Sequence, residues 1–364
     1  MVDIPGEIKA IEDEMRKTQY NKATEHHFGV LKAKIAKLRE KHEARQRSGG
    51  TGYSFSVKRS GDATVILVGF PSVGKSTLLN ALTGSKSATA AYAFTTLTVI
   101  PGVLMYKNAK IQILDVPGII AGAASGTGRG KEVLGVVRNA DMVLFVIDAG
   151  HPEQVERLRK EVYDSGVRLD ESPPNVKITR NARGGIRILT TCKQSISKKT
   201  FEDILKQFSI NNADIVIREN ITIERFIDGI QGGKSYLTSR IILNKADLYE
   251  KEAVKSAMKE SKAALPVSAT TGENVDALKE ELYKGLKLIP IYLKEVGKEP
   301  DMKIPLIVKE GATLRDISTH IHRDLQKLFK YARLWGPSAK FPAQVVKDLN
   351  RKVKAGDIVE FHAR

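Results

Sequence analysis

The sequence predicts an α/β protein: a largely parallel sheet interrupted by an α+β insert, preceded by a helical region and followed by a β-grasp-like unit. Three observations lead to this fold class. From Ala63 onward, short apolar strands alternate with helical segments, which is typical of a parallel sheet covered on both faces. Residues 149–239 separate two buried strands, although a crossover between parallel strands needs only about a dozen residues. A new strand, helix and closing strand follow Pro300.

The N-terminal region, residues 1–47, is expected to form two amphipathic helices or one long bent helix. Apolar side chains recur at helical spacing from Ile4 to Met15 and again from Phe28 to Leu38. The polar face of the second segment is strongly basic, and both an RNA contact and a solvated surface are compatible with it. A Gly-rich linker is expected at residues 48–61.

The sheet domain is expected to comprise residues 62–163 and 240–291. Its predicted strands are Val65–Val68, a hairpin Val103–Leu114 turning at Lys107 and Asn108, Met142–Asp148, and Arg240–Leu243. Its predicted helices are Lys75–Leu82, Pro152–Tyr163 and Val275–Leu286.

The insert is expected at residues 164–239 and the last unit at residues 300–364. The insert pattern predicts strands Ile186–Leu189 and Ile215–Ile217 and a helix Phe201–Phe208. Pro290 and Pro300 bracket a predicted linker. The last unit is predicted to contain a strand Ile304–Val308, a helix Leu314–Phe329 and a closing strand Asp357–Phe361.

Composition favours an anionic partner inside the cell. Fifty-nine Lys and Arg against 42 Asp and Glu give a formal charge of +17, which suits RNA, although good solubility from Lys-rich surfaces is the simpler alternative. The single cysteine, Cys192, excludes an intrachain disulfide and any multi-cysteine zinc site. No apolar run approaches the ~20 residues of a spanning helix. We therefore expect a cytoplasmic protein.

A phosphate-binding loop is indicated by Gly69–Ser76, which matches G-x-x-x-x-G-K-[ST] between an apolar strand and a helix. Its glycines let backbone N–H groups wrap a phosphate, and the helix N-terminus adds partial positive charge. We expect Lys75 to reach the β- and γ-phosphates and to act in catalysis, and the Ser76 hydroxyl to bind Mg²⁺. The nucleotide-contacting residues of this segment are expected to be Gly69, Pro71, Ser72, Val73, Gly74, Lys75, Ser76 and Thr77.

A second metal-facing segment is Asp115-Val-Pro-Gly118, which follows another apolar strand. Asp115 is expected to hold Mg²⁺ through water, while the Gly118 N–H detects the γ-phosphate. Between the two segments, Thr95-Thr96 supplies hydroxyls to a loop that orders around Mg²⁺ in the triphosphate state. We favour Thr96 as the ligand and expect Thr96 and Gly118 to take part in catalysis. The expected magnesium ligands are Ser76, Thr96 and Asp115.

Guanine is indicated by Asn244-Lys245-Ala246-Asp247 at the end of the strand Arg240–Leu243. The Asp247 carboxylate can accept hydrogen bonds from guanine N1–H and the 2-amino group, whereas adenine presents neither donor there. Lys245 can cover the base with its aliphatic stem. The backbone N–H groups of Ser268 and Ala269, after a short strand Leu265–Val267, would lie near guanine O6.

These motifs resemble the Obg-related translation GTPases, and above all their archaeal and eukaryotic developmentally regulated GTP-binding (DRG) branch. The likeness extends over nearly the whole chain and includes Tyr92-Ala-Phe-Thr-Thr-Leu, Asn21-Lys-Ala-Thr-Glu-His-His and Trp335-Gly336. One departure is Ala93, where relatives often carry a larger residue. The resemblance implies a P-loop GTPase domain, an insert related to a ribosomal-protein domain, a C-terminal TGS domain, and association with ribosomes or RNA.

Hydrolysis of GTP to GDP and phosphate is expected to be slow. Ras-like enzymes orient the attacking water with a glutamine just after D-x-x-G, and Ile119 occupies that position here. The Thr96 carbonyl, the glycine-rich stretch Gly118–Gly130 or a partner could place the water instead. Related GTPases use K⁺ to neutralise transition-state charge, but those with the clearest site carry Asn where this chain has Ser72. GTP or GDP and Mg²⁺ are the expected cofactors, with K⁺ left open.

The leading hypothesis is a nucleotide-controlled switch on ribosomes in translation. We expect rRNA or tRNA as a partner, allow for a stabilising protein partner, and expect neither DNA nor a membrane. Two alternatives stay open. The chain could be an RNA- or ribosome-binding adaptor in which GTP is mainly a structural ligand. It could also resemble the Obg-like ATPases, which carry a TGS domain as well, but Asp247 argues against ATP.

Overall fold

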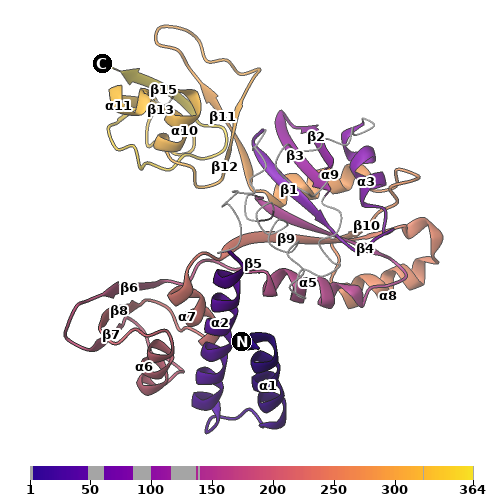
Figure 1. The fold of residues 1–364 in the computed structure, drawn as a ribbon. Helices are drawn as coiled ribbons and strands as arrows, with labels where there is room; N and C mark the ends of the chain where they lie inside the picture. Colours follow the sequence, from indigo (N-terminus) through magenta and orange to yellow (C-terminus); the bar gives the residue numbers. More distant parts are fainter. Residues whose placement is uncertain are drawn as a thin grey trace. The chain divides into compact units, whose positions relative to one another are not determined.

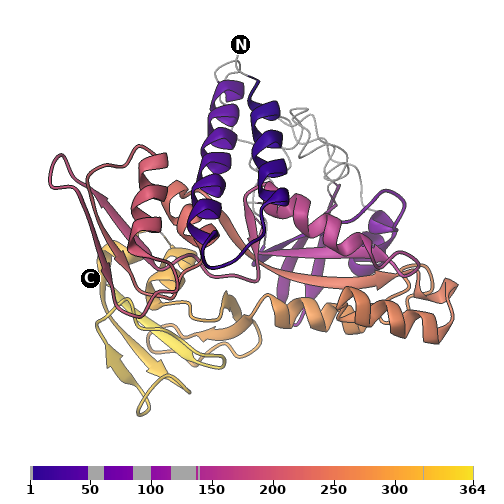
Figure 2. The same cartoon turned by 90° about the horizontal axis from the view of Figure 1, so that it is seen from below.

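A computed structural model describes residues 3–47, 61–84, 100–115, 137, 140–322 and 324–363. The chain forms two compact units, one consisting of Met1–Ser54 with Glu171–Tyr236 and the other of Phe55–Asp170 with Leu237–Arg364. Figure 1 and Figure 2 show their elements from two directions. In the described part of the chain, no helix combines the length and the apolar character that a membrane span requires.

The second unit contains a seven-stranded sheet with the order β10-β9-β4-β1-β3-β2, in which β5 pairs with β9. β1 is parallel to β3 and β4, and β9 is parallel to β4 and β10, whereas β2 runs antiparallel to β3. The strands are β1 (Ala63–Val68), β2 (Ile100–Tyr106), β3 (Ala109–Asp115), β4 (Met142–Asp148), β5 (Val167–Leu169), β9 (Ser235–Asn244) and β10 (Leu265–Pro266).

The predicted hairpin turns at Lys107 and Asn108, as expected. Both residues have positive φ, 48° and 62°. Two consecutive left-handed residues make the tight turn whose twist suits an antiparallel pair, and Asn tolerates this conformation better than most side chains. The local sequence signal was sufficient here because the turn depends only on adjacent residues.

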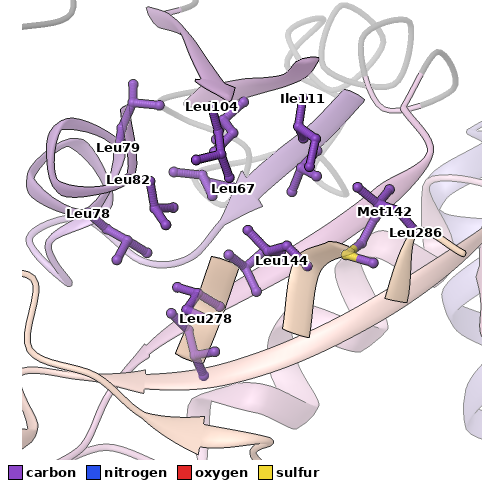
Figure 3. Close-up of a cluster of buried hydrophobic side chains, with 14 of the residues drawn as sticks. Leu67, Leu78, Leu79, Leu82, Leu104, Ile111, Met142, Leu144, Leu278 and Leu286 are labelled. Atoms are coloured by element: carbon purple, nitrogen blue, oxygen red, sulfur yellow. The ribbon is translucent and has the colours of Figure 1, made fainter. Parts of the chain in front are cut away.

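Helices cover both faces of this sheet. Leu78 of α3 (Lys75–Thr83) and Leu278 of α9 (Val275–Gly285) belong to a core cluster on one face, with Leu67 and Leu144 from the strands (Figure 3). Leu158 of α5 (Gln154–Asp164) and Ala257 of α8 (Lys251–Ser261) belong to the cluster on the other face. All residues of β1 and β4 are buried, which explains why their sequences are mostly apolar. The predicted α/β sandwich is therefore confirmed.

A second sheet in the same unit has the order β12-β11-β15-β13-β14. Its strands are β11 (Leu288–Leu293), β12 (Leu306–Lys309), β13 (Phe329–Trp335), β14 (Gln344–Val346) and β15 (Ile358–Ala363). The helices α10 (Leu314–Ile321) and α11 (Leu325–Leu328) accompany it. Leu314 and Ile317 of α10 pack with Leu334 and Val359 in its core.

The bounds of this C-terminal sheet differ from the sequence prediction in two places. Residues 290–300 were expected to be a linker, but Pro290 lies within β11, where its carbonyl accepts from the Gly356 N–H at 2.9 Å. A proline without an N–H can occupy a strand where no ladder donor is required at that position. The predicted helix Leu314–Phe329 is also interrupted, because α10 ends at Ile321 and Phe329 already belongs to β13.

The other unit combines the N-terminal helices with the insert. It contains α1 (Ile4–Lys17), α2 (Glu25–Arg47), α6 (Lys198–Gln207), α7 (Ile223–Gln231) and a three-stranded sheet of β6 (Val176–Arg180), β7 (Ile186–Thr190) and β8 (Ala213–Ile217). β8 is the central strand, antiparallel to β6 and parallel to β7. Ala33 of α2 packs with Phe201 and Phe226 in one core cluster. The N-terminal region therefore shares a core with the insert, which the sequence did not predict.

The insert is shorter than residues 164–239. Residues on both sides of it belong to the large sheet, because β5 pairs with β9 and β9 begins at Ser235. Asp170 reinforces this junction: its carboxylate accepts from the Ser239 N–H at 2.7 Å. The excursion from the large sheet therefore lies between Leu169 and Ser235, and the compact unit that contains it includes Glu171–Tyr236.

Candidate nucleotide site

The predicted site residues converge at one edge of the large sheet. In the parallel register Leu67 lies beside Asp115, Val68 beside Phe145, and Asp148 beside Asn244. These are the carboxyl ends of β1, β3, β4 and β9. In doubly wound sheets ligands bind at this edge, and the loops that leave it carry the binding groups.

Two glycines shape the phosphate-binding loop. A Cβ at Gly69 would lie 2.3 Å from the Val146 carbonyl oxygen, so only glycine allows the chain to leave β1 so close to β4. Gly74 has a φ of 90° and is the N-cap of α3, without a side chain to cap the helix. The N–H groups of the first helical turn have no intrahelical partner and point out of the helix. This arrangement suits an anionic phosphate group.

Lys75 lies across the loop. Its Nζ donates to the carbonyl oxygens of Gly69 at 3.0 Å and Phe70 at 2.9 Å. Burial lowers the pKa of Lys75, and the Asp115 carboxylate acts in the opposite direction. A cation that is partly withdrawn from water at a helix N-terminus interacts strongly with a phosphate, because the screening by solvent is reduced.

Ser76 and Asp115 are placed as magnesium ligands would be. The Ser76 Oγ donates to Asp115 Oδ2 at 2.6 Å, and the buried Asp115 Oδ1 has no hydrogen-bond partner among the described residues. Magnesium prefers hard oxygen ligands, often one or two from the protein with the rest from water and phosphate. The pair therefore fits Mg²⁺. Within the described residues, no group of three or more His, Cys, Asp or Glu could hold a metal ion.

Asn244 connects the phosphate-binding loop to the base-binding loops. Its Nδ2 donates to the Val73 carbonyl at 2.8 Å, and its Oδ1 accepts from the Ala269 N–H at 3.1 Å. A Cβ on Gly74 would lie 2.4 Å from the same Nδ2. The side chain is 1% exposed, so both hydrogen bonds are shielded from water. Asn244 thus holds three separate segments of the site together.

Lys245 is oriented by a residue that the sequence analysis did not select. Its Nζ forms an ion pair with Asp148 Oδ2 at 2.8 Å, and Asp148 Oδ1 accepts from Tyr249 OH at 2.9 Å and the Gly150 N–H at 3.0 Å. Burial opposes ionisation of Asp148, but the hydrogen bonds from Lys245, Gly150 and Tyr249 outweigh it and hold the pKa below its usual value. The available signal was an aspartate at the carboxyl end of an apolar strand.

Of the other predicted base-reading groups, the Asp247 carboxylate is free to bind guanine, whereas the N–H groups of Ser268 and Ala269 already donate to other atoms of the protein. Asp247 lies exposed in the short 3₁₀ helix Ala246–Leu248 and makes no hydrogen bond with a described residue, which leaves its carboxylate oxygens for guanine. The Ser268 N–H instead donates to the Glu273 carbonyl at 3.1 Å, and the Ala269 N–H donates to Asn244. In this conformation both N–H groups are engaged within the protein. Their role in base reading stays a prediction.

The predicted switch residues belong to segments that the structure does not describe. Thr96, Gly118 and Ile119 lie outside the described residues, as do the glycines up to Gly130. Of the predicted magnesium ligands, the structure brings together Ser76 and Asp115.

Three protein families match successive parts of the chain. Residues 64–180 match the family described as 50S ribosome-binding GTPase, and residues 183–288 match the C-terminal region of the same GTPase domain. Residues 289–363 match the TGS domain, which agrees with a C-terminal sheet that begins at β11.

Several GTP-binding proteins are similar over almost their entire length. The chain is 50% identical over 364 residues to an uncharacterized GTP-binding protein of Methanocaldococcus jannaschii, with 99% of this chain and 93% of that protein covered. It is 46% identical to GTP-binding protein 1 of Schizosaccharomyces pombe, with 97% of each covered. It is 42% identical to the developmentally-regulated GTP-binding protein 2 homolog of Dictyostelium discoideum, again with 97% of each covered.

Proposed function

Since this chain belongs to the developmentally regulated GTP-binding proteins, an Obg-related branch of the P-loop GTPases, we propose that it is a slow, Mg²⁺-dependent GTPase whose nucleotide state controls its binding to ribosomes. The observation that supports the proposal most directly is the buried Asn244 side chain. It links the phosphate-binding loop to the loop of Ala269. A movement of the phosphate-binding loop can therefore alter the position of the Ala269 loop, and a movement of the Ala269 loop can alter the phosphate-binding loop.

The reaction requires a triphosphate held in line with a water molecule. The N–H groups at the start of α3 and the Lys75 ammonium bind the phosphates, and Ser76 and Asp115 would hold Mg²⁺, which neutralises charge on the transferred phosphoryl group. Thr96 and Gly118 would complete the site in the GTP state. Ile119 cannot orient water through a polar side chain, so we expect slow turnover without a partner. K⁺ could assist by neutralising transition-state charge.

A ribosomal partner is supported by the family match and by charge. The GTPase domain matches a family described as ribosome-binding, and the chain carries a formal +17. A polyanionic partner such as rRNA or tRNA suits this charge, because neutralising phosphates releases counterions. Because translating ribosomes lie in the cytoplasm, we expect the chain to act there.

Sedimentation with ribosomes tests the switch. We expect the full chain to sediment with ribosomes when a non-hydrolysable GTP analogue is bound and to be released when GDP is bound, at one fixed salt concentration. The same measurements are made with Asp247→Asn, which weakens guanine binding. Sedimentation that depends on the nucleotide should fall in this variant, whereas sedimentation that depends only on the charge of the chain should not. Equal sedimentation in both nucleotide states would overturn the switch.

Phosphate release tests the catalytic half of the proposal. We expect slow release from the chain alone and faster release with ribosomes, measured in K⁺ and in Na⁺ at the same ionic strength. If no condition gives turnover and ribosome binding does not depend on the nucleotide, the chain is an adaptor in which GTP is structural.

A further inference from the structure

The three-stranded sheet of the insert has one covered face and one open face. On the covered face, Ile178, Ile188 and Ile215 join the core cluster with Phe201 of α6 and Phe226 of α7. Figure 1 shows α2, α6 and α7 on that side of β6, β8 and β7. The alternate side chains project from the opposite face. We call this the outer sheet face; it consists of Lys177, Thr179, Arg187, Leu189, Asp214 and Val216.

The register places cations at both edges of the outer sheet face. Lys177 on β6 and Leu189 on β7 flank Val216, and Thr179 and Arg187 flank Asp214. Leu189 is 64% exposed, although it is a large apolar residue in a strand. The Asp214 carboxylate accepts from the Asn181 side chain at 2.7 Å. The outer sheet face therefore carries one cation on each edge strand, while its central strand contributes Val216 and the carboxylate of Asp214.

All charged residues of the segment around this face are basic. Residues 172–201 contain no Asp or Glu. Their cations include Lys177, Arg180, Arg183, Arg187 and Lys193, which are all exposed and make no ion pair or side-chain hydrogen bond with a described residue. Lys177 and Arg187 lie on the outer sheet face, and Arg180, Arg183 and Lys193 lie at or beyond the ends of the same two strands. Together these exposed cations produce a local positive potential that favours a polyanion.

The basic face of α2 is different, because four of its cations already have partners within the same unit. Lys32 pairs with Glu224, Lys34 with Glu7 at 3.6 Å, and Arg39 with Glu12 at 3.2 Å, while Lys37 donates to Ser209 Oγ at 3.1 Å. Sequence alone could not choose between an RNA contact and a solvated surface for this helix. Its pairing makes it the weaker candidate and leaves the outer sheet face as the stronger one.

We propose that the outer sheet face binds the phosphate backbone of duplex RNA. The inference rests on the proposed function and deepens it, since it names the surface that would touch ribosomal RNA. Strands β6, β7 and β8 carry no aromatic residue, so the sheet offers no platform for stacking unpaired bases, the usual means of holding single strands. Exposed Lys and Arg side chains suit phosphates, and duplex RNA is recognised mainly through its backbone and shape.

The direct test measures the affinity of the full chain for a mixed-sequence RNA duplex of 24 base pairs by fluorescence anisotropy. The double variant Lys177→Gln, Arg187→Gln should weaken binding at least about tenfold. It should also reduce the slope of log affinity against log salt by about 2, since each phosphate contact contributes about 0.9. The control, Lys34→Gln with Arg39→Gln, removes the same charge from α2 and should change affinity less than about twofold.

An equal loss of duplex affinity in the two double variants would show that binding depends only on the net charge of the chain, and it would overturn the proposal. A stronger affinity for single-stranded RNA of the same length, or equal displacement of the duplex by polyglutamate, would overturn the choice of ligand. Unchanged melting temperatures and unchanged binding of a fluorescent GTP analogue establish that the variants are folded.

The inference and the proposed function fail separately. A wild-type chain that binds the duplex through Lys177 and Arg187, yet sediments with ribosomes equally in both nucleotide states, overturns the switch alone. A chain whose sedimentation depends on the nucleotide, but whose duplex affinity is equal in both double variants, overturns the inference alone.

Discussion

The Asn244 side chain donates to the Val73 carbonyl at 2.8 Å, across 171 positions of sequence. Through its other atom it accepts from the Ala269 N–H. Because the amide is buried, neither partner has water as a substitute. Asn244 therefore has a structural role that Asp247, exposed three residues later, does not share. The two residues of the same guanine motif should respond differently to substitution.

Replacement of Asn244 by Ala should lower both stability and GTP affinity. It leaves the Val73 carbonyl and the Ala269 N–H without partners, and each buried unpaired group costs about 1–3 kcal/mol. We expect a clear fall in melting temperature and at least a hundredfold loss of GTP affinity by fluorescence titration. Asp247→Asn should keep the melting temperature and weaken GTP by about 10- to 100-fold, or about 1–3 kcal/mol. Equal melting temperatures for both variants would contradict the link through Asn244.

Gly74→Ala should be more harmful than Gly84→Ala, although both glycines have positive φ. A left-handed conformation costs a non-glycine residue about 1–2 kcal/mol, and this cost is common to both. A Cβ at Gly84 meets no atom of a described residue within 4 Å, whereas one at Gly74 would lie 2.4 Å from Asn244 Nδ2. The comparison therefore isolates the contact with Asn244. We expect Gly84→Ala to retain GTP binding and Gly74→Ala to lose it; similar titrations for both would show that the loop tolerates the methyl group.

Asp148→Asn should weaken GTP binding without abolishing it. The substitution removes the charge that holds the Lys245 ammonium, so the stem of Lys245 loses its fixed position beside the base. Lys245 is partly exposed, which limits the effect to about 1 kcal/mol, or roughly fivefold in affinity. The faster dissociation of a fluorescent GDP analogue would be the clearest measurement. Tyr249→Phe removes one neutral hydrogen bond to Asp148 and should show a smaller change in the same direction.

Sequence patterns predicted the parts of the site that depend on adjacent residues. The phosphate-binding loop needs a strand, two glycines and a helix in succession, and the turn at Lys107 and Asn108 needs two neighbouring left-handed residues. Asp148 was missed because its role depends on the register that places β4 beside β9 and hence Asp148 beside Asn244. No spacing along the chain encodes that neighbour.

The domain bounds were harder to predict because long-range pairing decides them. β5 joins the large sheet through β9, a strand from much later in the chain, so residues 167–169 look like the start of the insert. The N-terminal helices share a core with the insert through Ala33 and Phe201, which are far apart in the sequence. Pro290 was interpreted as a linker residue, yet it lies in a strand whose neighbours come from later in the chain.

Lys75→Ala and Ser76→Asn should separate phosphate binding from magnesium binding. Lys75→Ala removes a cation that acts directly on the phosphates, so GTP affinity should fall both with Mg²⁺ and with a chelator. Ser76→Asn disturbs the hydroxyl that pairs with Asp115, so the affinity should fall mainly when Mg²⁺ is present. Titration of each variant in both conditions measures the difference. An equal response of Ser76→Asn in the two conditions would refute the proposed magnesium ligand.

Glu280 should make the stability of the sheet domain sensitive to acid. Hydrogen bonds from Lys107 and from Tyr106 lower the pKa of Glu280 from its ordinary value of 4.5 to about 2. Because the pKa is lower in the folded state, the ionised carboxylate stabilises the fold above about pH 4.5, and this contribution is lost as the pH falls toward about 2. Glu280→Gln should therefore be less stable than the wild type at pH 7 and approach it in acid. Urea midpoints between pH 7 and 3 measure the convergence. Glu273→Gln is the control that removes the same charge, since its exposed carboxylate forms no ion pair with a described residue.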